Sequence, residues 1–548
     1  MRAKNLSLRM ALASLLVFPY VWFATPLKAQ GLDISSARAQ ESARRLDELD
    51  RDADVRQTGD NVLADPLARR ELPPAGGPTV LLQRVVFAPA SAFLSAGELD
   101  EIAARYTGNS VDFRQISALV RDVNDLYAEK GVVTAAAILP PQDLAGGVLE
   151  VRLVEGQLGS VGIVGERQSS DEFILNRVRL SKGQTVDIPT ASRDIAYFNA
   201  TNRANLRLLL QPGASFGLTD LTLGVTEPPA QQLQFFLDNT GAESTGEQQI
   251  SSIYRRYGLA GLDDTFLAYA ALTDGSKSLT LRYDLPVTTI GTRLAGSYTL
   301  SDVEVTHGPA SDLGIEGNSE SVSLTLTQPF IANDTWLLEG VASVFAGSSE
   351  TDASGIPLVD SETDKLSFGL SFSYTNDRAF VTGQLLSVRA DTKDKTIDTS
   401  DDFDFVVGSL RGTYQINDTW RLIGNTSFQR SDEVLVPGDL LFQIGGPTTV
   451  RGYPSDGIAG DEGFYANLEV RHRSTFQGLP TDAYAFVDFG EVESTFPSKT
   501  NLLSTGVGID RAFSDRLSLN LSVAVPIEDA VPNQSSLVVS AVISIIAF

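Results

Sequence analysis

The chain has 548 residues, contains no cysteine and carries a formal net charge of −26. Without cysteine it has neither a disulfide framework nor a thiolate metal site, and His307 and His472 are its only histidines. We therefore expect no metal site, no cofactor and no catalytic centre. The acidic excess argues against a nucleic-acid partner.

The first 29 residues have the layout of a secretory signal peptide. Three basic residues precede the apolar run 10–24, and the small residue Ala29 stands at the expected cleavage site. The mature chain is therefore expected to begin near Gln30. An uncleaved membrane anchor is the alternative, but the apolar run is shorter than the ~20 residues that a spanning helix needs.

A charged helix and a linker are expected next. Residues 30–55 are helix-prone, with Leu46 and Leu49 as the only large apolar residues between Ile34 and Val55. Such a helix buries little surface by itself, so it lies either in solvent or inside a polar space. Residues 56–79 are rich in proline and glycine, which predicts a linker.

Two small units with the element order β-α-α-β-β follow, at 80–156 and 157–230. The first unit is predicted to have strands at 82–87, 132–139 and 147–154 and helices at 96–106 and 116–127, the second helix being capped by Gly131. The second unit repeats this order less clearly, with strands expected at 161–164, 206–211 and 218–225 and helices at 172–178 and 191–199.

From 231 to 548 the apolar period changes to two, as in membrane-spanning β-strands. After the N-terminal segment no run of ~18 apolar residues occurs, so only a closed barrel is able to span a membrane. Short turns alternate with longer polar stretches, and counting them gives about 16 strands. The short turns are expected near 263–264, 286–291, 332–334, 376–377, 417–418, 477–478 and 514–515. The long polar stretches are 306–318, 347–362, 391–402 and 432–461.

Aromatic residues stand where a membrane interface requires them. Asn333-Asp334-Thr335-Trp336 and Asn417-Asp418-Thr419-Trp420 repeat one pattern, in which a turn leads directly into a tryptophan. We expect Trp336 and Trp420 in an interfacial belt, although tryptophan following polar turns by chance gives the same pattern. The final apolar strand ends in Phe548 and is expected to close the barrel against its first strand.

Two motifs of the barrel region indicate an internal contact. Val450-Arg451-Gly452-Tyr453 lies in a glycine-rich loop, and Phe486-Val487-Asp488-Phe489-Gly490 lies in a strand, with 37 residues from Arg451 to Asp488. A pair between Arg451 and Asp488 would hold the loop, about 432–462, inside the barrel. Gly452 allows the backbone to turn, and Tyr453 and Phe486 are expected to pack beside the pair. The alternative is a solvated arginine and an unrelated aspartate.

These features together resemble the two-partner secretion transporters (TpsB, of ShlB/FhaC/HecB type), a branch of the superfamily that contains the BamA assembly factor. The small units resemble POTRA domains. Asn124-x-x-Tyr127-x-x-x-Gly131 and Val154-Glu155-Gly156 match the first POTRA domain of that branch, while Val132 stands where tyrosine is commoner. The resemblance covers nearly all of the mature chain. It implies a 16-stranded barrel after two α+β domains, a contact of Arg451 with Asp488, and an N-terminal helix that plugs the pore at rest.

The resemblance also implies a function in the outer membrane of a Gram-negative bacterium. A large unfolded exoprotein of adhesin or haemolysin type would be exported through the pore after POTRA domains bind it in the periplasm. An extended client segment is expected to add as a strand to an open sheet edge, which we place at Leu206, Leu208 and Leu210. The alternative is that these leucines only fill their own domain's core. No phosphate-binding glycine loop is visible, so folding of the client outside is expected to drive export.

Two other functions remain open. A barrel assembly factor of the same superfamily has a similar architecture, and a passive porin needs neither soluble domains nor the Arg451 contact. Outer-membrane lipid, lipopolysaccharide and the barrel assembly machinery, with Phe548 as an insertion signal, are further expected partners. The identity of the client, the departure of the plug and the oligomeric state stay undetermined by the sequence.

Overall fold

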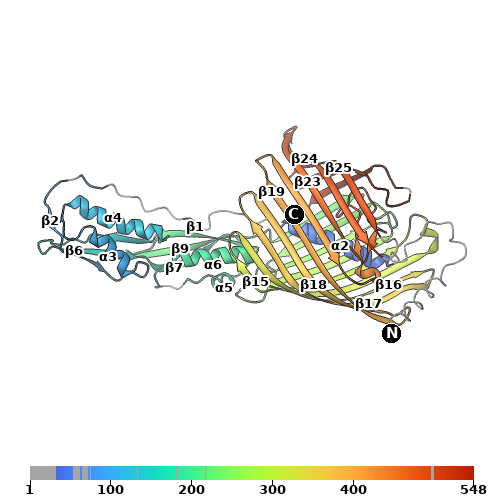
Figure 1. The fold of residues 1–548 in the computed structure, drawn as a ribbon, viewed down its shortest axis with the longest axis horizontal. Helices are drawn as coiled ribbons and strands as arrows, with labels where there is room; N and C mark the ends of the chain where they lie inside the picture. The colour runs from blue at the N-terminus through green and yellow to red at the C-terminus, as the bar shows by residue number, and fades with distance from the viewer. Residues whose placement is uncertain are drawn as a thin grey trace.

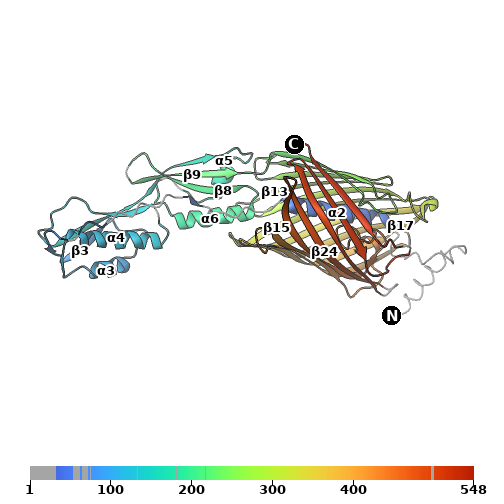
Figure 2. The same ribbon diagram turned by 90° about the horizontal axis from the view of Figure 1, so that it is seen from above.

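The computed structural model describes residues 33–53, 62–63, 72–74, 76–132, 134–180, 183–215, 217–494, 499–532 and 534–548. An arm of two small α/β units leads to a β-barrel, and helix α2 (Ile34–Ala53) lies inside the barrel (Figure 1, Figure 2). The predicted signal peptide and most of the predicted linker lie outside the described residues. Within the described part of the chain, no helix combines the length and apolar character needed to cross a membrane.

The first unit has the predicted order β-α-α-β-β. Its elements are β3 (Arg84–Ala88), α3 (Ala96–Ala104), α4 (Phe113–Glu129), β5 (Ala135–Ile138) and β6 (Val148–Glu155), with the two-residue strands β2 (Val80–Leu81) and β4 (Ser110–Val111) pairing beside them. The three main strands form a sheet in the order β3-β6-β5.

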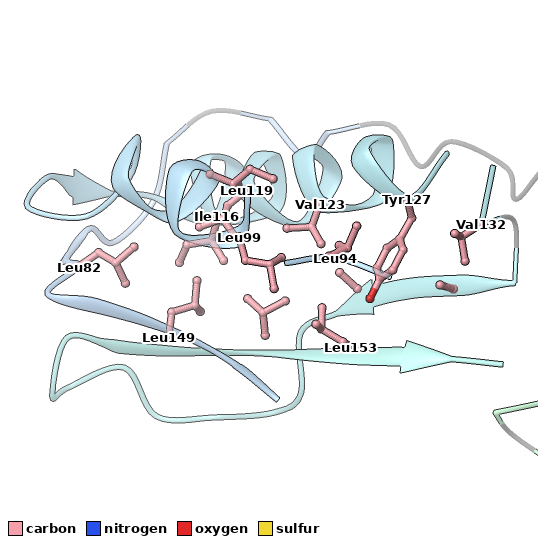
Figure 3. Packing of buried hydrophobic residues seen from close by; sticks show 14 of the residues in the cluster. Leu82, Leu94, Leu99, Ile116, Leu119, Val123, Tyr127, Val132, Leu149 and Leu153 are labelled. Carbon is pink, nitrogen blue, oxygen red and sulfur yellow. The ribbon is translucent and has the colours of Figure 1, made fainter. Parts of the chain in front are cut away.

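Helix α4 packs on this sheet because its apolar residues recur at helical spacing. Its buried residues Ile116, Leu119, Val123 and Tyr127 face strand residues such as Leu149 in one core (Figure 3). Asp112 begins the helix with a capping box, in which its side chain accepts from the backbone of Gln115. The core therefore follows directly from the sequence periodicity.

The second unit repeats the order with β7 (Gln157–Val164), α5 (Asp171–Leu175), α6 (Ile188–Thr201), β8 (Asn205–Pro212) and β9 (Leu218–Thr226). The sheet order is β1-β8-β9-β7, in which β1 (Val62–Leu63) pairs in parallel with β8. An asparagine of the second helix serves the same purpose in both units. Asn124 accepts from the backbone of Ala137 at 2.7 Å, and Asn199 accepts from Leu206 at 2.7 Å. Each amide fixes its helix to the first strand of the following pair.

The barrel closes with sixteen strands in chain order, as predicted. They are β10 (Gln231–Asp238), β11 (Gln249–Tyr257), β12 (Thr265–Leu272), β13 (Ser276–Pro286), β14 (Arg293–Glu304), β15 (Ile315–Ala332), β16 (Trp336–Ala353), β17 (Ile356–Thr375), β18 (Ala379–Asp394), β19 (Thr399–Gln415), β20 (Trp420–Arg430), β23 (Glu462–Phe476), β24 (Leu479–Glu493), β25 (Thr500–Ser514), β26 (Leu517–Pro526) and β27 (Val538–Ile546).

All seven predicted short turns lie between strands at one end of the barrel, the end that faces the α/β units (Figure 1). Two of the predicted long loops are wrong. The stretches 347–362 and 391–402 are mostly paired strand, with tight turns at Ser354-Gly355 and before Asp398, where the φ angles of Ser354 and Asp398 are 51° and 50°. Polar residues in these stretches predict loops, but two neighbouring strands continue to pair their backbones in water wherever both remain extended.

The wall separates an apolar outside from a hydroxyl-rich inside. On β15, Leu324 and Leu326 are 50% and 43% exposed and face outward, whereas Thr325 bonds Ser343 of β16 at 3.0 Å. Alternation of this kind is required of a strand that has lipid on one side and a lumen on the other.

The barrel closes between its first and last strands. Five residues of β10, Gln234–Asp238, pair with β27, and Leu233 adds a bond from its N–H to the Phe548 carbonyl at 3.1 Å. Neighbouring pairs such as β10–β11 and β26–β27 share eight residues each. The seam is thus the shortest ladder in the described barrel.

We predict that Tyr127→Phe destabilises the first unit by about 1.5–3 kcal/mol, the range for a hydrogen bond to a charged group. Burial raises the pKa of Tyr127, so the phenol stays protonated and donates to Glu155 at 2.9 Å. Faster amide hydrogen exchange within α4 of the full-length protein in detergent is the measurement. Tyr106→Phe is the control, because Tyr106, which donates to Asp122, is only partly buried, whereas Tyr127 is 1% exposed; an equal effect of both changes would contradict the prediction.

Candidate functional site: the loop and helix inside the barrel

The loop between β20 and β23 folds back into the lumen instead of leaving the barrel. It contains the 3-10 helix η3 (Gly438–Leu440) and the short strands β21 (Phe442–Gln443) and β22 (Ala459–Gly460). Its first part packs Val436, Leu440 and Leu441 on Phe403 and Phe405 of the wall, and all five side chains are buried. The inserted loop is therefore anchored by apolar contacts before the arginine motif begins.

The structure brings Arg451 and Asp488 together. The Arg451 Nε and Nη2 atoms lie 2.7 and 2.8 Å from the two carboxylate oxygens of Asp488, and the Arg451 backbone N–H donates to the same carboxylate at 3.1 Å. Asp488 is fully buried in the wall on β24, and the Arg451 side chain is 17% exposed. This is a two-pronged ion pair with little access to water. Removing one partner would leave the other charge buried without compensation, which is costly.

Phe486 and Tyr453 complete the contact in different ways. The Arg451 guanidinium lies 3.4 Å from the centre of the Phe486 ring, which is a cation–π contact. The Tyr453 hydroxyl lies 2.8 Å from the Leu503 carbonyl oxygen and 2.9 Å from that of Glu528. Tyr453 thus ties the loop to the connection after β26 as well as to the wall.

Two glycines of the motifs make room for this arrangement. Gly452 has φ of 89°, a left-handed conformation that costs other residues energy. At Gly490 of the wall an added Cβ would lie 2.8 Å from Val450 Cγ2, so a larger residue would push the fully buried Val450 of the loop away from the wall. Packing and hydrogen bonding therefore explain why the two motifs contain these glycine, valine and tyrosine residues, in addition to the residues of the ion pair.

Sequence reasoning missed a second acid at this contact. Glu469 of β23 accepts from Arg451 Nη1 at 2.9 Å and also pairs with Arg471, which lies 3.6 Å from Asp510. The signal that could have revealed Glu469 is the polar or charged residue at every second position of β23, which is typical of a lumen-facing row. The arginine motif is one part of a charge network along the β23–β25 wall.

Helix α2 fills the space that the loop leaves open. Gln40 and Arg44 donate to the loop carbonyls of Asp439 and Gln443 at 2.8 and 3.0 Å. On the opposite side, Ser35 bonds Ser349 and Ser42 bonds Ser278 of the wall, both at 2.9 Å. A cavity of about 240 Å³ remains between the helix and strands β14 to β17, lined largely by serine and threonine. The helix is thus held mainly by polar contacts that water can replace.

The apolar hold on α2 is small. Leu46 is 3% exposed and packs with Phe236, Ile253, Leu267 and Tyr269 of the wall, and Leu49 lies partly buried beside it. This contact lies on β10 to β12, close to the seam with β27.

The predicted docking residues are not accessible, and the prediction of an open edge at β8 is wrong. Leu206 and Leu208 are fully buried, and Leu210 packs against the same core. The backbone of Leu206 is occupied by the Asn199 amide, and β1 pairs along Leu208 and Leu209. The domain's own core and the chain's own N-terminal segment compete for this strand, which no local pattern reveals.

The interfacial aromatics lie on the outer surface at the end of the barrel near the α/β units. Trp336 and Trp420 begin β16 and β20, are 46% and 42% exposed, and contact Tyr374 and His472 at ring distances of 4.7 and 4.6 Å. In both turns the asparagine side chain accepts from the backbone of the tryptophan three residues later. Phe548 gives its carbonyl to the seam and leaves its ring half-exposed.

Metal ligands are not gathered at this site: among the residues that the structure describes, no group of three or more histidine, cysteine, aspartate or glutamate side chains is arranged to hold a metal ion.

Comparison with known proteins identifies the family. A model described as "Haemolysin secretion/activation protein ShlB/FhaC/HecB" matches residues 217–511, more than half of the chain. The chain belongs to this family. A POTRA domain model of ShlB type matches residues 80–156, the first α/β unit.

Relatives of similar sequence are named transporters. The transporter CdiB of Dickeya dadantii is 23% identical over 413 residues, 72% of each chain. The heme/hemopexin transporter protein HuxB of Haemophilus influenzae is 21% identical over 463 residues, 80% of this chain and 81% of HuxB. Among solved structures, CdiB from Escherichia coli has a TM-score of 0.65 at 20% identity and covers 93% of this chain and 98% of its own. BamA from Haemophilus ducreyi, lacking POTRA domains 1–3, has a TM-score of 0.53 at 13% identity and covers 85% of this chain and 100% of its own.

This ShlB-type protein is therefore an outer-membrane transporter of the TpsB kind, with its POTRA domains in the periplasm. The short turns of the barrel and the two tryptophans accordingly lie on the periplasmic side. The connection that returns into the lumen enters from the outer side.

We predict that Arg451→Ala frees the loop tip locally, with a loss of about 3–5 kcal/mol, because Asp488 is left buried without a partner. Arg451→Lys should lose less, since it keeps the charge but neither the two-pronged bond nor the ring contact. Amide hydrogen exchange of residues 449–453 measures both.

Arg421→Ala is the matched control for this prediction. Arg421 pairs with Asp482 inside the same barrel, at 2.6 Å, near the periplasmic ends of β20 and β24, whereas Arg451 contacts Asp488 further along β24. Exchange at 449–453 that rises equally in the control would show that the effect is general loosening of the wall.

Proposed function

We propose that this transporter exports a large, unfolded exoprotein of adhesin or haemolysin type, which its POTRA domains bind in the periplasm. The observation that supports this most is the pair of occupants inside the barrel. A passive porin keeps its lumen open to solutes, whereas here a loop and a helix fill it. A lumen that is filled at rest suits a protein client whose arrival displaces one of the segments that fill it.

Of the two occupants, the helix is the part that would leave. The loop is held by two apolar clusters and by the ion pair of Arg451 with fully buried Asp488. Helix α2 has one well-buried leucine and otherwise polar contacts, and the wall beside it is lined by hydroxyl groups that bond water equally well. In our proposal the loop is a fixed part of the wall and the helix is the plug.

Client docking would be coupled to plug release through β1. The pairing of β1 with β8 supports the idea that this edge accepts an extended segment, with main-chain hydrogen bonds as the attraction. A client strand that replaced β1 would free the chain that leads to α2, since only residues 54–61 separate the two elements. Docking at the edge of β8 therefore requires that β1 be displaced, instead of using an edge that is already open.

Folding of the client outside would provide direction, because burial of its apolar surface prevents return. The same proposal includes two further partners. Lipid and lipopolysaccharide surround the outward face that carries Leu324, and the barrel assembly machinery acts on the last strand β27 and the terminal Phe548.

A second candidate, a factor that inserts other barrels, is favoured by one observation. The seam between β10 and β27 is the shortest ladder in the described barrel, so it is where the wall would open sideways. Depletion of this protein separates the two functions. Loss of an assembly factor would lower the amounts of unrelated outer-membrane proteins, whereas loss of an exporter would lower only the amount of its client in the culture supernatant.

We predict that Arg451→Ala lowers secretion of the exoprotein client, identified by its loss from culture supernatant when this transporter is depleted, at least about ten-fold. A loop released by several kcal/mol populates other positions in the pore. Immunoblotting of culture supernatant measures this, with Arg421→Ala as control. Unchanged secretion in Arg451→Ala, with the protein correctly assembled, would refute the proposal that export depends on the inserted loop held by Arg451.

We predict that Leu46→Ala raises the conductance of the transporter in planar lipid bilayers. Truncation of a buried leucine costs about 2–5 kcal/mol, which weakens the main apolar hold on α2. Ser42→Ala removes one hydroxyl bond of the same helix and should change conductance less. Deletion of residues 34–53 sets the fully open level; a Leu46→Ala channel as closed as the wild type would contradict the plug.

A further inference from the structure

A buried carboxylate joins the second POTRA domain to the mouth of the barrel. Asp263 lies in the periplasmic turn between β11 and β12, is fully buried and has φ of 63°, in the left-handed region. The sequence marked this position only as a turn. Asp263 takes part neither in the Arg451–Asp488 ion pair nor in the contacts of helix α2.

The Asp263 carboxylate bonds both parts of the molecule. It accepts the backbone N–H groups of Arg203 and Ala204, at 3.1 and 2.9 Å, where α6 ends and β8 begins. It also pairs with Arg293 of the barrel wall at 3.0 Å. Ala204 is fully buried, so its N–H would be left unsatisfied without this acceptor. One side chain therefore bonds the soluble domain and neutralises a wall arginine.

The neighbouring residue supplies an apolar contact at the same point. Leu262 packs against the hydrophobic core of the second POTRA domain, and the Gly261 carbonyl accepts from the Ser170 N–H at 3.0 Å. The turn 258–264 thus inserts into the domain with one apolar and one charged residue. Combined contacts of this kind fix orientation, because rotation of the domain breaks them together.

Further bonds leave the domain little freedom. Tyr197 donates to the Ile290 carbonyl at 2.9 Å and Arg177 donates to that of Thr288 at 2.8 Å, both in the next periplasmic turn. The covalent link is short, since β9 ends at Thr226 and β10 begins at Gln231. Asp263 is a fully buried carboxylate that bonds across the same junction.

We propose that Asp263 is a positioning residue that holds the second POTRA domain at a fixed angle to the barrel mouth, so that strand β8 stays aligned with the lumen. The alignment has a purpose only under the proposed export function, but the fixed angle itself does not depend on export. Structure and secretion are therefore measured separately.

The test variant is Asp263→Asn, which keeps the size and tolerates positive φ but removes the charge. The chain has no native cysteine, so spin labels can be placed at Arg193 of α6 and Asp377 of a periplasmic turn without other changes. We expect the distribution of distances between the labels to widen in Asp263→Asn, and secretion to fall several-fold. Heat-modifiable gel mobility checks that the barrel has assembled.

Asp284→Asn is the matched control, because Asp284 lies on β13 of the barrel wall and accepts from the same Arg293 at 2.8 Å. It interacts with the second POTRA domain through the charge of Arg203, whereas Asp263 accepts hydrogen bonds from the backbone of that domain. It should leave the distribution narrow. Leu262→Ala is a second test variant that cuts the apolar half of the contact without changing charge, and it should widen the distribution too.

The outcomes are distinguishable. Narrow distributions in both test variants, or equal widening in Asp284→Asn, overturn the positioning role whatever happens to secretion. A wide distribution with normal secretion supports the fixed angle and tells against the docking step of the proposed function.

Discussion

The need to satisfy every backbone hydrogen bond inside a membrane determines the rest of this structure. Strands in lipid cannot leave an edge unpaired, so the sheet closes on itself through the bonds between β10 and β27. A ring of sixteen strands encloses more space than inward side chains can fill. The lumen is therefore occupied by other parts of the same chain, and the chemistry of those contacts decides which part is able to move.

The two occupants are bound by different forces. The loop rests on apolar clusters and on the Arg451–Asp488 pair, which has lost most of its access to water. The helix α2 rests mainly on polar contacts with hydroxyl, carbonyl and charged groups, among them the pair of Asp47 with Arg282 at 3.4 Å. The two occupants of the barrel are thus held by different kinds of contact, since the helix adds one small apolar cluster around Leu46.

The periplasmic arm connects to the barrel through few covalent residues but many buried bonds. The turn 258–264 enters the second POTRA domain, and β1 pairs with β8 in the sheet of that domain. The soluble domain is therefore in contact with the wall through Asp263, and its sheet includes a strand that is separated from α2 in the sequence only by residues 54–61.

The sequence by itself determined the features that depend on neighbours along the chain: the β-α-α-β-β order, the period-two strands, the seven short turns, and the pairing of motifs that pointed to Arg451 and Asp488. Tertiary structure alone decided what depends on distant residues. It extended β16 and β17 through the stretch 347–362 that was expected to form a loop, buried Leu206 and Leu208, and covered their strand with β1. It also brought Glu469 and Asp263 into charge networks. Periodicity and turn chemistry are local, whereas the burial of a leucine or a carboxylate is set by whichever remote segment packs against it.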